Sequence, residues 1–357
     1  MKSLIRLVVT CAAFALPGSL HAATAAVTVG SPAPPIVNAA YIRGEPVKSF
    51  EPGKVYMVEF WATWCGPCVA SIPHINDLHR KFADKGFIVI GQNISEPDLT
   101  LVEPFLKEMG DKMTYRVALD DTQGSEKGKM MDTWMKAAGI KSIPNAFLIG
   151  KDQKIAWIGH PLELKEETVE AVLAGTFDVP AFAKKYAEQA ALDEKISTLL
   201  SSTRLKITVS DWEAANRDIE ELTKLTAESQ PFMPDLLRLE MACKRADLPA
   251  ATALTKKFAI DQAKSASLVA HACALLEGAA KGDRPTLEVA DKILSDIAAA
   301  QEKKGVSLLV QQARVKKALG KTEEAVTLAG QAMAAAPEKA RPAVKKSLEG
   351  VLPADAP

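Results

Sequence analysis

One short stretch decides the fold of this chain: Trp64-Cys65-Gly66-Pro67-Cys68. It places two thiols three positions apart, just after the apolar run of residues 55–61. A strand over that run would deliver Cys65 to the first turn of a helix, where unpaired N–H groups and the helix dipole favour a thiolate. Cys68 would follow one turn later on the same face, within reach of a mixed disulfide on Cys65. The spacing therefore predicts a redox-active dithiol.

Two other interpretations of the cysteine pair are weaker. A structural zinc site needs a second pair of Cys or His ligands at suitable spacing, and none follows within reach. A purely structural disulfide between Cys65 and Cys68 closes so short a loop that it restricts the unfolded chain very little. We therefore expect no metal, nucleotide or organic cofactor.

The residues around the dithiol resemble a known family. Residues 58–68, VEFWATWCGPC, are similar to the active-site segment of the thioredoxin superfamily, especially the exported TlpA-type thiol-disulfide oxidoreductases. Pro73 falls where that family kinks its active-site helix, and Ile143-Pro144 looks like the cis-proline loop that faces the dithiol. A cis bond is physically reasonable there because only X-Pro bonds adopt cis at low cost. The resemblance covers about residues 27–177.

The resemblance implies a role for each residue of the site. Cys65 would be the attacking thiolate and Cys68 the resolving thiol. Glu59 occupies the position of the family's buried carboxylate, usually an aspartate, and would accept or relay the proton that Cys68 loses. Pro144 would present its backbone to an extended partner segment. The substrate-docking residues around them would be Trp64, Gly66, Pro67 and Ile143.

Strand and helix signals alternate through the first half of the chain. Short apolar strands are predicted at residues 55–60, 87–93, 114–119, 146–149 and 155–158, and helices at 68–84, 98–109, 125–138 and 165–173. This alternation predicts an α/β, thioredoxin-like domain over residues 27–178, with a central sheet covered on both faces. Residues 95–138 exceed a minimal thioredoxin and resemble the strand-helix insertion of TlpA-type and peroxiredoxin-like proteins.

The composition changes after Pro180, where strand signals end and alanine-rich helical spacing begins. Segments 241–243, 271–273 and 312–314 each lie late in an apolar-periodic helix, and each is followed by a polar or Gly/Pro break and a second helix. Their spacing brackets the repeat of about 34 residues in tetratricopeptide proteins. We therefore predict an all-α, tetratricopeptide-like repeat domain over residues 180–352, with an irregular helical bundle as the alternative.

The N-terminus has the pattern of a secretory signal peptide over residues 1–22. Lys2 and Arg6 precede an apolar run over residues 7–16, and small residues follow. That run, which contains Cys11, is too short to span a bilayer, so an uncleaved anchor is the lesser alternative. The pattern predicts an exported, periplasmic or other extracytoplasmic protein, where a disulfide reductant needs its own electron donor.

The overall composition restricts the partners. The chain has 357 residues, which suits about two domains, and its formal net charge of zero favours neither nucleic acid nor an acidic membrane surface as a partner.

Gly66-Pro67 resembles the reducing thioredoxins, so we expect a protein-disulfide reductase acting on protein disulfides. A further partner could dock on the helical domain.

Two alternative functions come from other classes. A peroxide-reducing redoxin would need a Thr-x-x-Cys setting, whereas Thr63 lies only two residues before Cys65. The other alternative is a non-enzymatic adaptor, in which the helical domain binds a partner and the dithiol is incidental. The two intact cysteines and the matching Pro144 argue against it.

His74 and His160 are expected to be structural rather than part of the site. Cys243 and Cys273 are expected to be buried small hydrophobes rather than a disulfide bridge, because neighbouring repeat helices would place them too far apart.

Overall fold

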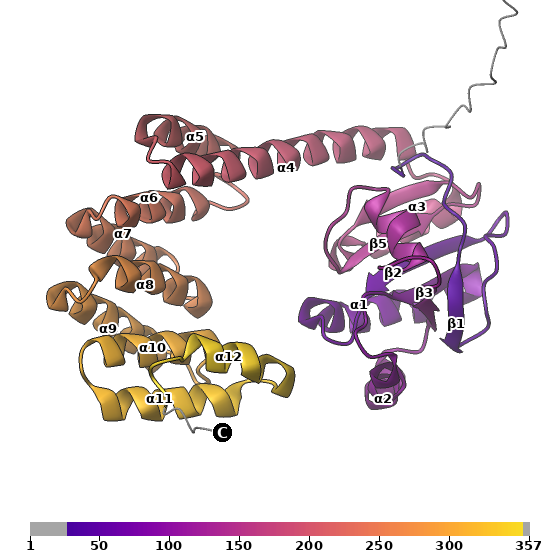
Figure 1. The fold of residues 1–357 in the computed structure, drawn as a ribbon. Coiled ribbons are helices and arrows are strands. Elements are labelled where there is room, and N and C mark those ends of the chain that lie inside the picture. The colour runs from indigo at the N-terminus through magenta and orange to yellow at the C-terminus, as the bar shows by residue number, and fades with distance from the viewer. Residues whose placement is uncertain (1–26, 353–357) are drawn as a thin grey trace, which may run out of the picture. The chain divides into compact units, whose positions relative to one another are not determined.

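The computed structural model describes residues 27–352 (Figure 1). The chain falls into two compact units, with the division between Glu188 and Gln189. The predicted signal peptide, with Cys11, lies outside the described residues. The two units are described separately.

The first unit is built on a six-stranded mixed sheet with the order β1-β4-β3-β2-β5-β6. The strands are β1 Asn38–Arg43, β2 Val55–Trp61, β3 Phe87–Asn93, β4 Arg116–Asp120, β5 Asn145–Ile149 and β6 Ile155–Gly159. Strands β2, β3 and β4 are parallel, β1 is antiparallel to β4, and β5 is antiparallel to β2 and β6. Because Trp61 pairs with Asn93 in register, the segments that follow β2 and β3 leave the sheet at the same edge.

Helices cover both faces of this sheet (Figure 1). They are α1 Gly66–Phe82, α2 Val102–Met109, a π-helix at Met131–Lys136, and α3 Glu166–Ala174. Every residue of β2 is buried, as expected for a central strand. Met57 and Trp61 pack with α1 in one apolar cluster, whereas Val58 and Phe60 pack with Trp134 in another. The alternation places these two clusters on opposite faces and confirms the α/β, thioredoxin-like fold.

Two local predictions needed correction. Strand β1 was not expected, because its sequence NAAYIR lacks a clear apolar alternation and it forms an irregular edge pairing with β4. The helix predicted over residues 125–138 is shorter, since the π-helix begins at Met131. Gly128 has a left-handed φ of +103°, and both carboxylate oxygens of Asp120 accept backbone N–H groups, from Met130 and Met131. The backbone conformation of Gly128 and the two hydrogen bonds to Asp120 therefore keep the residues before the π-helix in a loop.

The second unit is all α-helical. Helix α4, Val179–Thr208, contains the division between the units, and the later helices are α5 Trp212–Leu225, α6 Met233–Lys244, α7 Leu248–Asp261, α8 Ala266–Ala280, α9 Arg284–Ala299, α10 Val306–Ala318, α11 Thr322–Ala335 and α12 Arg341–Ser347. The predicted helix pairs are present as α6/α7, α8/α9 and α10/α11. Asp247 and Asp283 cap the second helices of the first two pairs, by accepting N–H groups from Ala250 and Thr286.

The two cysteines of the second unit are not bridged to each other, as expected. Cys273 is buried, Cys243 is half-buried, and both are free thiols that belong to one apolar cluster. Burial raises the pKa of Cys243 to about 11 and that of Cys273 to about 12. Within residues 27–352, no helix is long and apolar enough to cross a membrane.

Candidate active site

The two cysteines lie at the start of helix α1 and are joined in a disulfide. Cys65 is the N-cap residue, with extended backbone, and its sulfur accepts a hydrogen bond of 3.2 Å from the N–H of Cys68. Pro67 occupies the first turn, where its missing N–H leaves no helical bond unmade, and that turn contains no acidic residue. The Cys65 sulfur therefore lies at the positive end of the helix dipole, which favours a thiolate once the disulfide is reduced.

The residues around the dithiol differ widely in solvent exposure. Cys65 is 5% exposed and Cys68 1%, whereas the intervening Gly66 and Pro67 are exposed. Trp64 is 53% exposed, although it is a large aromatic residue. A partner that approaches the cysteines would therefore meet the Trp64 ring and the Gly66-Pro67 backbone first.

The loop before β5 contains the predicted cis peptide, between Ile143 and Pro144. Pro144 is buried. Ile143 packs against the same apolar cluster that contains Cys65 and Cys68. The sheet pairing explains this placement, because Asn145 at the start of β5 lies opposite Phe60 near the end of β2.

Glu59 is a buried carboxyl on the central strand. It is 1% exposed, and strand alternation places it on the same face as its neighbours Met57 and Trp61, the face that α1 and the dithiol cover. Oε1 of Glu59 accepts a hydrogen bond of 3.0 Å from the Tyr115 hydroxyl. Desolvation raises the pKa of Glu59 to about 8, and the hydrogen bond from Tyr115 opposes part of that rise. The group is therefore suited to exchange a proton near neutral pH.

Sequence reasoning missed Glu96, which follows β3. Both of its carboxylate oxygens accept hydrogen bonds of 2.9 Å from Thr63, one from the backbone N–H and one from the hydroxyl. The Asn93 side-chain amide donates a third bond, of 3.2 Å. Glu96 thus holds the turn that precedes Cys65. The sequence shows only that Glu96 follows a strand signal over residues 87–93, which does not by itself predict the contact with Thr63.

Two histidines of the first unit, His74 and His160, have backbone hydrogen-bond partners. His74 Nε2 lies 2.9 Å from the carbonyl of Leu164, and His160 Nδ1 accepts a hydrogen bond of 3.2 Å from the N–H of Leu162. His79 is half-buried and its ring meets the Tyr115 ring edge-on at 6.3 Å. Desolvation lowers the pKa of His79, and the nearby guanidinium groups of Arg116 and Arg80 lower it further.

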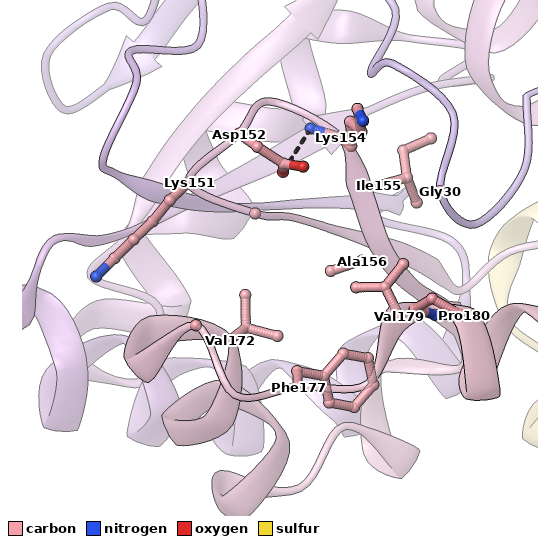
Figure 2. A pocket seen from close by; sticks show the side chains of 12 residues that line it. Gly30, Lys151, Asp152, Lys154, Ile155, Ala156, Val172, Phe177, Val179 and Pro180 are labelled. Carbon is pink, nitrogen blue, oxygen red and sulfur yellow. Dashed lines mark hydrogen bonds between the residues drawn. The ribbon is translucent and has the colours of Figure 1, made fainter.

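A separate cavity of about 460 Å³ lies between the β5–β6 turn and the start of α4. Figure 2 shows the apolar side chains of Ala156, Val172 and Phe177 around it. Neither cysteine, Glu59 nor the cis-proline loop is among the residues that line it. This cavity is therefore not part of the candidate active site at the dithiol.

Comparison with known proteins places the first unit in a family. Residues 28–173 match the Redoxin family model. The chain is 31% identical over 142 residues to the thiol-disulfide oxidoreductase ResA of Geobacillus thermodenitrificans, covering 40% of this chain and 75% of that protein. It is 28% identical over 210 residues to Protein FixW of Rhizobium leguminosarum, covering 56% and 92%. The crystal structure of StoA from Bacillus subtilis is 24% identical, covering 39% of this chain and 96% of that one, with a TM-score of 0.31. The chain therefore belongs to the family of ResA-type thiol-disulfide oxidoreductases.

Proposed function

We propose that this protein reduces disulfide bonds in partner proteins, with Cys65 as the attacking thiolate and Cys68 as the resolving thiol. The observation that carries the proposal is the position of Cys65 at the N-cap of α1, where its sulfur accepts the N–H of Cys68. A thiolate at that position gains from the helix dipole, while Cys68 lies one turn inside the helix.

The reaction proceeds in two exchange steps. The Cys65 thiolate attacks one sulfur of a partner disulfide; a new bond forms between Cys65 and the partner, the partner's S–S bond breaks, and its second sulfur leaves as a thiolate. Cys68 then loses its proton and attacks the Cys65 sulfur, which releases the partner's first sulfur. Two electrons have moved to the partner, whose two thiolates then take up protons from water to give a dithiol, and the Cys65–Cys68 disulfide remains.

Glu59 would accept the proton that Cys68 loses in the second step. The support is its burial on the face of β2 that the dithiol covers, together with a pKa raised to about 8 by desolvation. A carboxylate with a pKa near that of a thiol can take up the thiol proton without a large energy difference. Pro144, in the loop that precedes β5, would present its backbone to an extended segment of the partner.

The direction of electron flow is also part of the proposal. Gly66-Pro67 between the cysteines resembles the reducing thioredoxins, and the N-terminal pattern of residues 1–22 supports export. An exported reductant then needs an electron donor that restores its dithiol in the same compartment.

The helical unit would serve to dock a partner protein. The support is the succession of helix pairs α6/α7, α8/α9 and α10/α11, since stacked pairs of this kind create extended surfaces. The assignment of residues 27–178 to a redox domain and of residues 180–352 to a tetratricopeptide-like domain is part of this proposal. The first turns of α4, up to Glu188, nevertheless belong to the compact redox unit.

A turnover assay tests the proposed activity. The full chain, kept reduced by dithiothreitol, should accelerate the reduction of insulin disulfides, and Cys65→Ala should abolish that acceleration. Cys273→Ala is the matched control and should leave it intact, because Cys273 is a buried structural thiol of the helical unit. Consumption of hydrogen peroxide without insulin reduction would instead identify a peroxide-reducing redoxin.

A further inference from the structure

The turn that presents Cys65 is short and depends on a neighbouring segment. Only residues 62–64 separate the last residue of β2 from Cys65, and within the turn the Cys65 N–H donates to the carbonyl of Ala62 at 3.2 Å. The segment after β3 supplies further bonds. The Ile94 N–H donates to the Trp61 carbonyl at 3.0 Å, and the Trp64 indole N–H donates to the Ser95 carbonyl at 3.1 Å.

Glu96 contributes the charged contact in this set. One carboxylate oxygen accepts the Thr63 backbone N–H and the other accepts the Thr63 hydroxyl, each at 2.9 Å. Two bonds from one carboxylate fix both the backbone and the side chain of Thr63. Asn93 donates to the same carboxylate, and Ser95 adopts a left-handed φ of +53° between the two. This local geometry places the Glu96 carboxylate against the turn.

We propose that Glu96 is a positioning residue, which acts through Thr63 to hold Cys65 in its capping position. The inference rests on the proposed attacking role of Cys65. Productive attack requires the sulfur to lie in line with the partner disulfide, and a displacement of about 1 Å can cost about a hundredfold in rate. The contacts of Glu96 with Thr63 would add to the turn and helix hydrogen bonds of Cys65 in holding that alignment.

A second possible effect of Glu96 is its charge alone. It lies in the wall of a cavity of about 730 Å³ that also includes Glu126. Glu126 is exposed, and it provides a matched carboxylate in the same cavity. Positioning and charge predict different behaviour of the variant Glu96→Gln. The glutamine side chain would be neutral, yet its amide oxygen could still accept the Thr63 N–H while its amide nitrogen donates to the Thr63 hydroxyl.

Turnover in the full chain distinguishes the two effects. We expect Glu96→Ala to lower kcat/KM for insulin reduction about tenfold, while Glu96→Gln and the control Glu126→Ala stay close to the parent protein. Thr63→Val should also lower kcat/KM, Thr63→Ser should restore it, and the pair Glu96→Ala with Thr63→Val should lose less than the product of the single losses. Equal losses in Glu96→Ala, Glu96→Gln and Glu126→Ala, or multiplicative losses in the pair, would overturn the proposal.

Amide hydrogen exchange tests the contact without reference to which cysteine attacks. In the oxidised full chain, the Thr63 amide should exchange at least about tenfold faster in Glu96→Ala than in the parent protein, while amides of the core strand β2 stay protected. Unchanged protection at Thr63 would refute positioning by Glu96 even if Cys65 is the nucleophile. Attack by Cys68 would refute the proposed roles of the cysteines and leave the exchange result to decide whether Glu96 holds the turn.

Discussion

The Tyr115 hydroxyl donates a hydrogen bond of 3.0 Å to Oε1 of Glu59, and both side chains are almost wholly buried. Tyr115 reaches Glu59 across Gly91 of β3, where a Cβ would stand 2.9 Å from the Tyr115 ring and 3.1 Å from Glu59 Oε1. Burial and the neighbouring Glu59 hold the pKa of Tyr115 well above its usual value, so Tyr115 remains a donor. The hydrogen bond from Tyr115 therefore affects the pKa of Glu59, which sets the pH at which this carboxyl ionises.

The raised pKa of Glu59 predicts a specific pH dependence of stability. The folded protein keeps the Glu59 proton up to about pH 8, whereas the unfolded chain loses it near 4.5. Protonated Glu59 therefore contributes to the free energy of unfolding fully below the unfolded pKa. This contribution, on the order of a few kcal/mol, is lost as pH rises toward 8. Urea unfolding of the oxidised protein should show the parent losing stability relative to Glu59→Gln between pH 5 and 8. Parallel curves would contradict the assignment.

Removal of the Tyr115 hydroxyl should move the pH profile of activity. Tyr115→Phe deletes the hydrogen bond that lowers the pKa of Glu59, so the pKa of that carboxyl should rise further above 8. If the Glu59 carboxylate takes the Cys68 proton, the rise of kcat/KM with pH should shift upward by about one to two units. Tyr41→Phe is the control, because the Tyr41 hydroxyl donates to the Val47 carbonyl instead. Identical shifts in both variants would count against a role for Glu59.

A methyl group at Gly91 should disturb the same pair. Gly91→Ala would place its Cβ too close to the Tyr115 ring, with Glu59 Oε1 and the Trp61 indole nitrogen also near. Overpacking of this kind typically costs about 1–3 kcal/mol. Gly278→Ala is the comparison, since helix α8 leaves open space at that position and alanine favours a helix. Thermal unfolding should show a lower midpoint for Gly91→Ala only.

The first turns of α4 are expected to stabilise the redox unit. Phe182 packs against Trp157 at a ring distance of 6.4 Å and against Phe177 at 5.7 Å, and the division between the units lies after Glu188. A chain of residues 27–188 should therefore unfold at a higher temperature than one of residues 27–177, because the shorter chain exposes Trp157. Equal midpoints would show that the start of α4 adds nothing to this core.

The sequence predicted those parts of the site that depend on local pattern. Cys65 and Cys68 could be placed on a helix start because Val55–Trp61 and Pro67 are adjacent to them. The contacts of Glu96 and Tyr115 could not be predicted in that way. Thr63 meets Glu96 because Trp61 and Asn93 are partners in the β2–β3 register, and Tyr115 reaches Glu59 only because Gly91 lacks a side chain. Such contacts depend on tertiary register, which two apolar strands do not encode.

The central claim is that Cys65 attacks and Cys68 resolves, and trapping of the mixed disulfide tests it most directly. Reduced Cys68→Ala and Cys65→Ala proteins are each mixed with oxidised insulin, quenched in acid, and analysed by mass spectrometry for a covalent adduct. Cys243 and Cys273 contribute little background, because burial raises the pKa of both thiols far above neutral. We expect a stable adduct on Cys65 in Cys68→Ala and almost none in Cys65→Ala. A dominant adduct on Cys68 in Cys65→Ala, with none in Cys68→Ala, would contradict the account.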